Sequence, residues 1–152
     1  MDTALSNSAL MLLVGLAVFF AVVFGGAVAV VRYIGRQKEA GARARYPRAR
    51  RVERAANFFG RESRGVMQMR GNGILVLTDA ELIFEMWLWN TEVRIPLRSI
   101  QSVETPLSFL GKSRLTPLLK VVYTTPEGGT DAVAWQVSDL SGWVRQINEA
   151  RV

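Results

Sequence analysis

The chain has 152 residues, a hydrophobic fraction of 49%, a net charge of +6, and neither cysteine nor histidine. This length predicts one modest domain, and the missing residue types exclude a disulfide framework and the side chains most often used in acid–base and thiol catalysis. We therefore expect a protein that is not an enzyme and that holds no metal or cofactor.

The first predicted element is a transmembrane helix over residues 9–31, where nearly every residue is apolar or Gly. These residues span roughly 35 Å as a helix, enough to cross a hydrocarbon core of about 30 Å. A cleaved signal peptide is the alternative. Such peptides begin with positive charge, however, and the only charged side chain before the apolar run is Asp2. Residues 1–8 would form a short extracytoplasmic N-terminus. Small residues recur every four positions of the span and would allow homo-oligomerisation through close helix packing: Ala17, Ala21, Gly25 and Ala29.

A basic juxtamembrane stretch follows, predicted as a helical linker over residues 32–57. We expect Pro47 to end a first helix, and a second one to run from Arg48 to about Asn57. Against Glu39 and Glu53, the stretch carries nine cations: Arg32, Arg36, Lys38, Arg43, Arg45, Arg48, Arg50, Arg51 and Arg54. The positive-inside rule then places the C-terminal part in the cytoplasm and the N-terminus outside a plasma or inner membrane.

Two interpretations of this basic belt stay open. Its side chains bind anionic lipid headgroups, at on the order of 1 kcal/mol for each Lys or Arg, or they only fix the topology. Residues 55–152 hold ten cations and ten carboxylates, so the basic charge belongs to the belt and not to the domain. Nucleic acid is therefore not an expected partner, since the belt is linear and has no interleaved aromatic residues.

The remaining sequence predicts a mainly β domain over residues 58–152. Short β-type runs separated by turn residues are expected at 66–69, 74–77, 81–87, 92–95, 100–104, 118–124 and 131–137. Apolar residues then recur at helical spacing from Leu140 to Ile147, with Ser138 or Asp139 as the N-cap. We expect about seven antiparallel strands closed by a C-terminal α-helix, in addition to the transmembrane helix.

Two motifs resemble the pleckstrin-homology-like superfold, and within it the GRAM-like and bacterial pleckstrin-homology domains. Residues 73–84, GILVLTDAELIF, resemble the pattern G-x-L-x-L-T-x-x-x-L-x-F, and residues 95–103, IPLRSIQSV, resemble I-P-L-x-x-I-x-x-V. The resemblance covers about residues 58–150 and implies a small barrel or sandwich. It also implies binding of phosphoinositides or other lipids, peptides or partner proteins. Phosphoinositide binders of this kind concentrate cations between their first two strands, where Arg70 stands alone in this sequence.

Two segments are candidate interaction surfaces. The predicted hairpin tip contains Trp87 and Trp89, which either pack under the linker or contact a partner or the membrane interface. In the loop over residues 106–115, apolar side chains either enter the bilayer beside cations that meet headgroups, or fold under and close the barrel. These loop residues are Leu107, Phe109, Leu110, Lys112 and Arg114.

Together these observations predict a non-catalytic, membrane-anchored scaffold that binds a protein partner or assembles with itself at the cytoplasmic membrane face. Direct binding of anionic lipid through the basic belt and the 106–115 loop is one alternative. An accessory subunit of a larger membrane complex is another.

Overall fold

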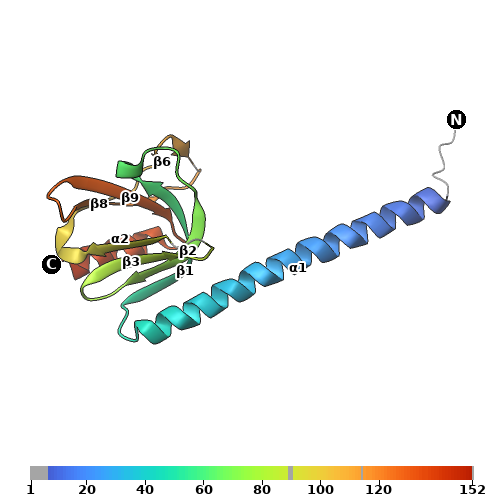
Figure 1. Ribbon diagram of the computed structural model, residues 1–152, viewed down its shortest axis with the longest axis horizontal. Coiled ribbons are helices and arrows are strands. Elements are labelled where there is room, and N and C mark those ends of the chain that lie inside the picture. The colour runs from blue at the N-terminus through green and yellow to red at the C-terminus, as the bar shows by residue number, and fades with distance from the viewer. Residues whose placement is uncertain (1–6, 89–90, 114, 152) are drawn as a thin grey trace. The chain divides into compact units, whose positions relative to one another are not determined.

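The computed structural model describes residues 7–88, 91–113 and 115–151. These belong to two compact units, Met1–Ile34 and Gly35–Val152. The first unit consists of the N-terminal part of helix α1 (Asn7–Arg45), shown in blue in Figure 1. By length and composition this helix can span a membrane, since its most apolar window has a mean hydropathy of 2.6. The small residues Ala17, Ala21, Gly25 and Ala29 are exposed along it.

The prediction that Pro47 ends the first helix is confirmed, because α1 stops at Arg45. Tyr46 still donates its N–H to the carbonyl of Ala42, at 2.8 Å. The prediction of a second helix over Arg48–Asn57 is wrong, since strand β1 (Arg51–Arg61) occupies this segment and runs through position 58. The Arg, Glu and Ala residues there favour a helix, but pairing with β2 and β9 on the two sides of β1 outweighs that preference.

The second unit is built on an antiparallel seven-stranded sheet in the order β4-β3-β2-β1-β9-β8-β5. Its other strands are β2 (Gly71–Leu77), β3 (Glu81–Met86), β4 (Glu92–Pro96), β5 (Ile100–Glu104), β8 (Leu119–Thr124) and β9 (Thr130–Gln136). A small hairpin pairs β6 (Ser108–Phe109) with β7 (Lys112–Ser113). Two 3₁₀ turns, η1 (Glu62–Arg64) and η2 (Leu97–Ser99), lie in the connections, and helix α2 (Leu140–Ala150) follows the sheet.

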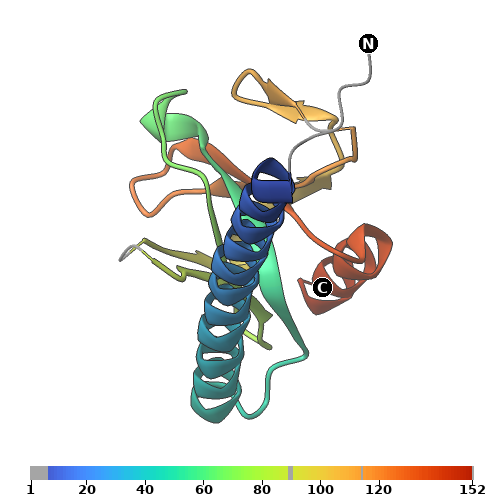
Figure 2. The ribbon, with the colours of Figure 1, turned by 90° about the vertical axis from the view of Figure 1, so that its right-hand side faces the viewer.

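The strand expected at residues 66–69 is absent, and irregular backbone connects η1 to β2 instead. The position beside β2 is taken by β1, which pairs with it from Arg51 to Phe58. On its other side β1 pairs with β9 from Asn57 to Arg61, and the register shifts at a bulge between Phe58 and Gly60, where Gly60 has a φ of 132°. This bulge carries the β1–β2 connection to the same end of the domain as the β6–β7 hairpin (Figures 1 and 2).

The inner face of the sheet and helix α2 form the main core. Phe58, Phe84 and Trp135 pack together there, with the first two rings stacked at 5.2 Å. Trp143 and Ile147 from α2 are fully buried in the same cluster, as the helical spacing predicted. The helix begins at Asp139, whose carboxylate accepts the N–H of Gly142 at 3.0 Å, so one of the two predicted N-caps is confirmed.

Candidate interaction surfaces

The end of α1 packs onto the outer face of the sheet. We call residues 35–45 the docked helix end. Its Ala42 is fully buried against Ile74, Val76 and Ile83, the outward-facing side chains of β2 and β3. The central part of β2 is therefore buried on both faces, which explains its unbroken apolar run.

Trp87 covers a second part of the docked helix end. A β-carbon placed on Gly35 would lie only 3.1 Å from the Trp87 ring, so glycine lets the ring approach the helix backbone. Trp87 is half-buried in the same outer cluster as Ala42. For this residue the structure shows packing under the linker, one of the two interpretations drawn from the sequence. Trp89 lies outside the described residues.

Five of the nine cations of the basic belt form ion pairs with carboxylates of the chain. Arg45 pairs with Glu85 at 2.5 Å, and Glu39 accepts Arg43 at 3.1 Å and Arg54 at 3.6 Å. Two further arginines reach carboxylates far along the chain, in the pairs Arg50–Asp79 at 2.5 Å and Arg51–Asp139 at 2.8 Å. The remaining cations of the belt are exposed: Arg32, Arg36, Lys38 and Arg48. Four of the nine belt cations, Arg45, Arg50, Arg51 and Arg54, thus join separate elements of the second unit, whereas Arg43 pairs within α1.

The start of the β1–β2 connection is held by a buried carboxylate. Asp131 of β9 is 3% exposed and accepts the backbone N–H and hydroxyl of Ser63, at 2.9 and 2.8 Å. Tyr123 and the N–H of Ala132 also donate to it. Burial pushes the pKa of Asp131 upward, but these hydrogen bonds outweigh burial and lower the pKa below its usual range. Burial also raises the pKa of Tyr123 to about 12.

The other end of the same connection is held by Gln68 and Arg70. Gln68 accepts the N–H of Arg61 at 2.9 Å and donates back to the Arg61 carbonyl at 2.5 Å. Lys112, from the β6–β7 hairpin, donates to the Gln68 carbonyl at 3.1 Å. The guanidinium of Arg70 lies 3.7 Å from the ring centre of Phe59. The β1–β2 connection is therefore fixed at both ends, and it is joined to the hairpin.

The 106–115 loop divides into covered and exposed residues. Phe109 is buried with Phe59 and Leu118 in a cluster on the outer side of β9, and Leu110 packs against that cluster. Leu107 is exposed, whereas Lys112 is half-buried because it reaches Gln68. Arg114 lies outside the described residues. Part of this loop thus closes the fold, as one of the sequence interpretations expected, and part of it protrudes.

Large exposed apolar side chains of the described second unit gather in three connections. Met67 is 96% exposed and Leu115 is fully exposed. Val66 and Met69 accompany Met67 in the β1–β2 connection, Leu88 follows β3, and Leu107 lies with Leu115 between β5 and β8. We call these six residues the loop surface. Sequence analysis missed its first part because alternation in residues 66–69 was interpreted as a strand.

A hollow of about 540 Å³ links two of these connections. Three of its lining residues are methionines, and a fourth, Phe58, belongs to the main core. Its full lining is Phe58, Arg64, Met67, Gln68, Met69, Met86 and Thr91. Flexible, polarisable thioether side chains adapt to apolar groups of many shapes, so this methionine hollow suits an apolar occupant of no fixed form.

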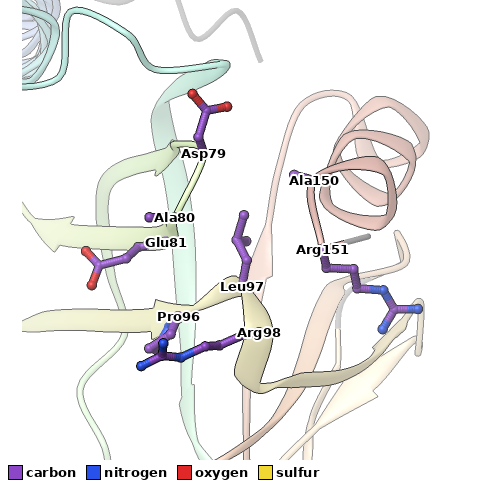
Figure 3. A pocket seen from close by; sticks show the side chains of 8 residues that line it. All are labelled: Asp79, Ala80, Glu81, Pro96, Leu97, Arg98, Ala150 and Arg151. Atoms are coloured by element: carbon purple, nitrogen blue, oxygen red, sulfur yellow. The ribbon is translucent and has the colours of Figure 1, made fainter.

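A different hollow, of about 450 Å³, lies where the β2–β3 turn, η2 and the end of α2 meet (Figure 3). Leu97 and Ala150 stand at its centre, and charged side chains of both signs surround them. Its lining is Asp79, Ala80, Glu81, Pro96, Leu97, Arg98, Ala150 and Arg151. We call it the polar-rimmed hollow. Sequence analysis did not find it, because its residues come from three separate segments.

No family model matches the chain, and no curated protein matches it. Among solved structures, the chain is similar to the crystal structure of the C-terminal domain of an unknown protein from Leishmania infantum. The TM-score is 0.53 at 13% sequence identity, and the likeness covers 74% of this chain and 96% of that one. At this identity the likeness concerns the fold alone, a β-sheet domain shared with that structure.

Proposed function

We propose that the protein is a non-catalytic, single-pass membrane module that holds a protein partner at the cytoplasmic face of a plasma or inner membrane. The N-terminal helix supports the anchor, because one of its windows reaches a mean hydropathy of 2.6. The arginines that follow residue 31 support a cytoplasmic location for the β domain by the positive-inside rule.

We further propose that the β domain is pleckstrin-homology-like. Four consecutive antiparallel strands, β1 to β4, are followed by β5, β8 and β9, and by a C-terminal helix whose Trp143 and Ile147 enter the core. This succession agrees with the motifs at residues 73–84 and 95–103. Since one fold serves many functions, the role is argued from the surface.

The observation that carries the proposed function is the docked helix end. Because Ala42 is buried on the sheet and Arg45 and Arg54 are paired, the domain is fastened to the residues that directly follow the predicted span. A domain that includes the helix end next to the span is suited to keeping a partner near the membrane, as a scaffold does. Among the described residues no cluster of three potential metal ligands is present, and catalysis is not part of the proposal.

The polar-rimmed hollow is the proposed partner site. Above the buried Leu97, the half-buried Pro96 and Ala150 and the exposed Ala80 form an apolar floor inside a charged rim, which matches the anatomy of protein–protein contacts. Its lining holds Asp79 and Glu81 beside Arg98 and Arg151, and the two carboxylates are already paired with Arg50 and Arg94. The exposed apolar residues of the loop surface favour a second role, direct contact between the domain and membrane lipid.

Photo-crosslinking in the native membrane tests the partner role. A photoreactive residue at Ala80, in the rim, should give one discrete protein adduct, and the same residue at the exposed Pro126 should not. Arg98→Glu should abolish the adduct at Ala80 if the rim charges select the partner. Equal labelling at Ala80 and Pro126, or an adduct with lipid alone, would contradict the proposal.

A further inference from the structure

We infer that the loop surface sits in the headgroup layer of the same bilayer that carries α1, with Met67 and Leu115 as its inserting side chains. The inference rests on the proposed membrane anchor. It names a lipid surface as the occupant, in place of a second copy of the chain or another protein.

The first argument is the rigidity of the exposed segment. A mobile loop would shield its apolar side chains by folding them back, yet Met67 stays 96% exposed while the backbone on both sides is bound. Ser63 is held by Asp131, and Gln68 is held by Arg61 and Lys112. The polar network thus presents Met67 outward, and isolated protruding apolar residues are suited to insertion between lipid headgroups.

The second argument is a charge asymmetry that the neutral total of the domain conceals. Residues 61–70 and 105–118 together carry Glu62 against five cations: Arg61, Arg64, Arg70, Lys112 and Arg114. One of these, Arg61, is paired at 3.8 Å with the buried Asp131 of β9, which leaves a net excess of three positive charges. The rest of residues 55–152 carries five cations against nine carboxylates. An anionic leaflet therefore attracts the two apolar connections and repels the remaining surface. Because β1 ends at Arg61, the first connection also holds Arg64, and Arg70 does not stand alone there.

The third argument is that the exposed apolar connections are linked to one another within the β domain. The methionine hollow is lined by Met67 and Met69 of the β1–β2 connection and by Thr91 of the β3–β4 connection, where Leu88 is exposed. Lys112 joins the β6–β7 hairpin to Gln68 in the first of these connections. One lipid surface can therefore meet all three connections.

Single-cysteine variants of the full chain test this inference, since the natural sequence has no cysteine and each variant takes one label. The variants are Met67→Cys and Leu115→Cys, with Ala80→Cys as an exposed control outside the loop surface and Val18→Cys inside the span. Each carries an environment-sensitive fluorophore in vesicles of phosphatidylcholine, with and without phosphatidylglycerol. A quencher attached to the lipid chains near the headgroups reports insertion, and iodide reports exposure to water.

We expect the lipid-borne quencher to remove most of the fluorescence at positions 67 and 115 when phosphatidylglycerol is present, and little at position 80. Quenching at 67 and 115 equal to that at 80 would overturn the inference. Protection from both quenchers would also overturn it, because a protein or a second copy would then cover the surface. Lipid quenching at position 18 verifies the anchor separately, so its failure would count against the proposed function and not against the loop surface alone.

Discussion

The docking of α1 on the sheet predicts that Ala42→Glu releases the helix end. Ala42 is fully buried against Ile74, Val76 and Ile83, and an unpaired carboxylate there has no hydrogen-bonding partner. Full burial of an aliphatic side chain contributes about 1.5–3 kcal/mol, and the helix end shares the cover of these three with Tyr46, Ala49, Val52 and Trp87, so its own contribution is on the order of 4 kcal/mol. Loss of about 3 kcal/mol of that contribution raises the open population about 100-fold.

Trypsin cleavage after Arg45 measures this opening, because proteolysis of a transiently open segment follows its population. In the full chain held in detergent or nanodiscs, we expect Ala42→Glu to be cut at Arg45 about 100-fold faster than the natural sequence. Hydrogen exchange in residues 74–83 should rise in parallel. Ala40→Glu is the matched control, since Ala40 lies on the same helix but is exposed.

The reasoning fails if the two variants are cut at the same rate. It also fails if residues 74–83 keep their protection in Ala42→Glu, because the outer faces of β2 and β3 would then not depend on the helix for cover.

Two further predictions concern the β domain. Gly73→Ala should lower the free energy of unfolding by about 3 kcal/mol or more, because the added β-carbon would lie 2.4 Å from the Glu85 carbonyl oxygen. The control Gly41→Ala, where nothing lies within 4 Å, should be neutral or stabilising, and chemical denaturation compares the two. Asp131 has a lowered pKa, so its contribution to stability is present above the usual carboxyl range and is lost as pH falls through the folded value. Unfolding measured between neutral and acidic pH should therefore show a loss that Asp131→Asn lacks, and identical pH profiles would contradict the assignment.

The spacing of apolar residues correctly predicted those strands and helices in which one face enters the core. Residues 81–87 and 131–137 became strands β3 and β9 nearly as expected, because one face of each enters the core. The C-terminal helix and its Asp139 cap also follow from local spacing. These signals depend on neighbours within a few residues, so a single sequence reveals them.

The predictions failed where the structure depends on contacts between residues far apart in the chain. Strand β1 is rich in Arg and Ala, and only its partners on both sides, β2 and β9, make it extended. The pairs Arg50–Asp79 and Arg51–Asp139 join residues 29 and 88 positions apart, so a local charge count assigned the arginines to a free belt. The polar-rimmed hollow likewise needs segments brought together by the sheet. Chain spacing carries no information about such contacts.

Because β2 is buried on both faces, a soluble version of the domain has to keep the residues that cover its outer face. A recombinant chain that began at residue 58 would lack more than half of β1 and all of the docked helix end, leaving Ile74, Val76 and Ile83 without that cover. Such a product would be expected to aggregate through that uncovered face. A chain that begins at Gly35 keeps Ala42 and Tyr46 in place while it omits the apolar segment, and is the natural starting point for expression and crystallisation.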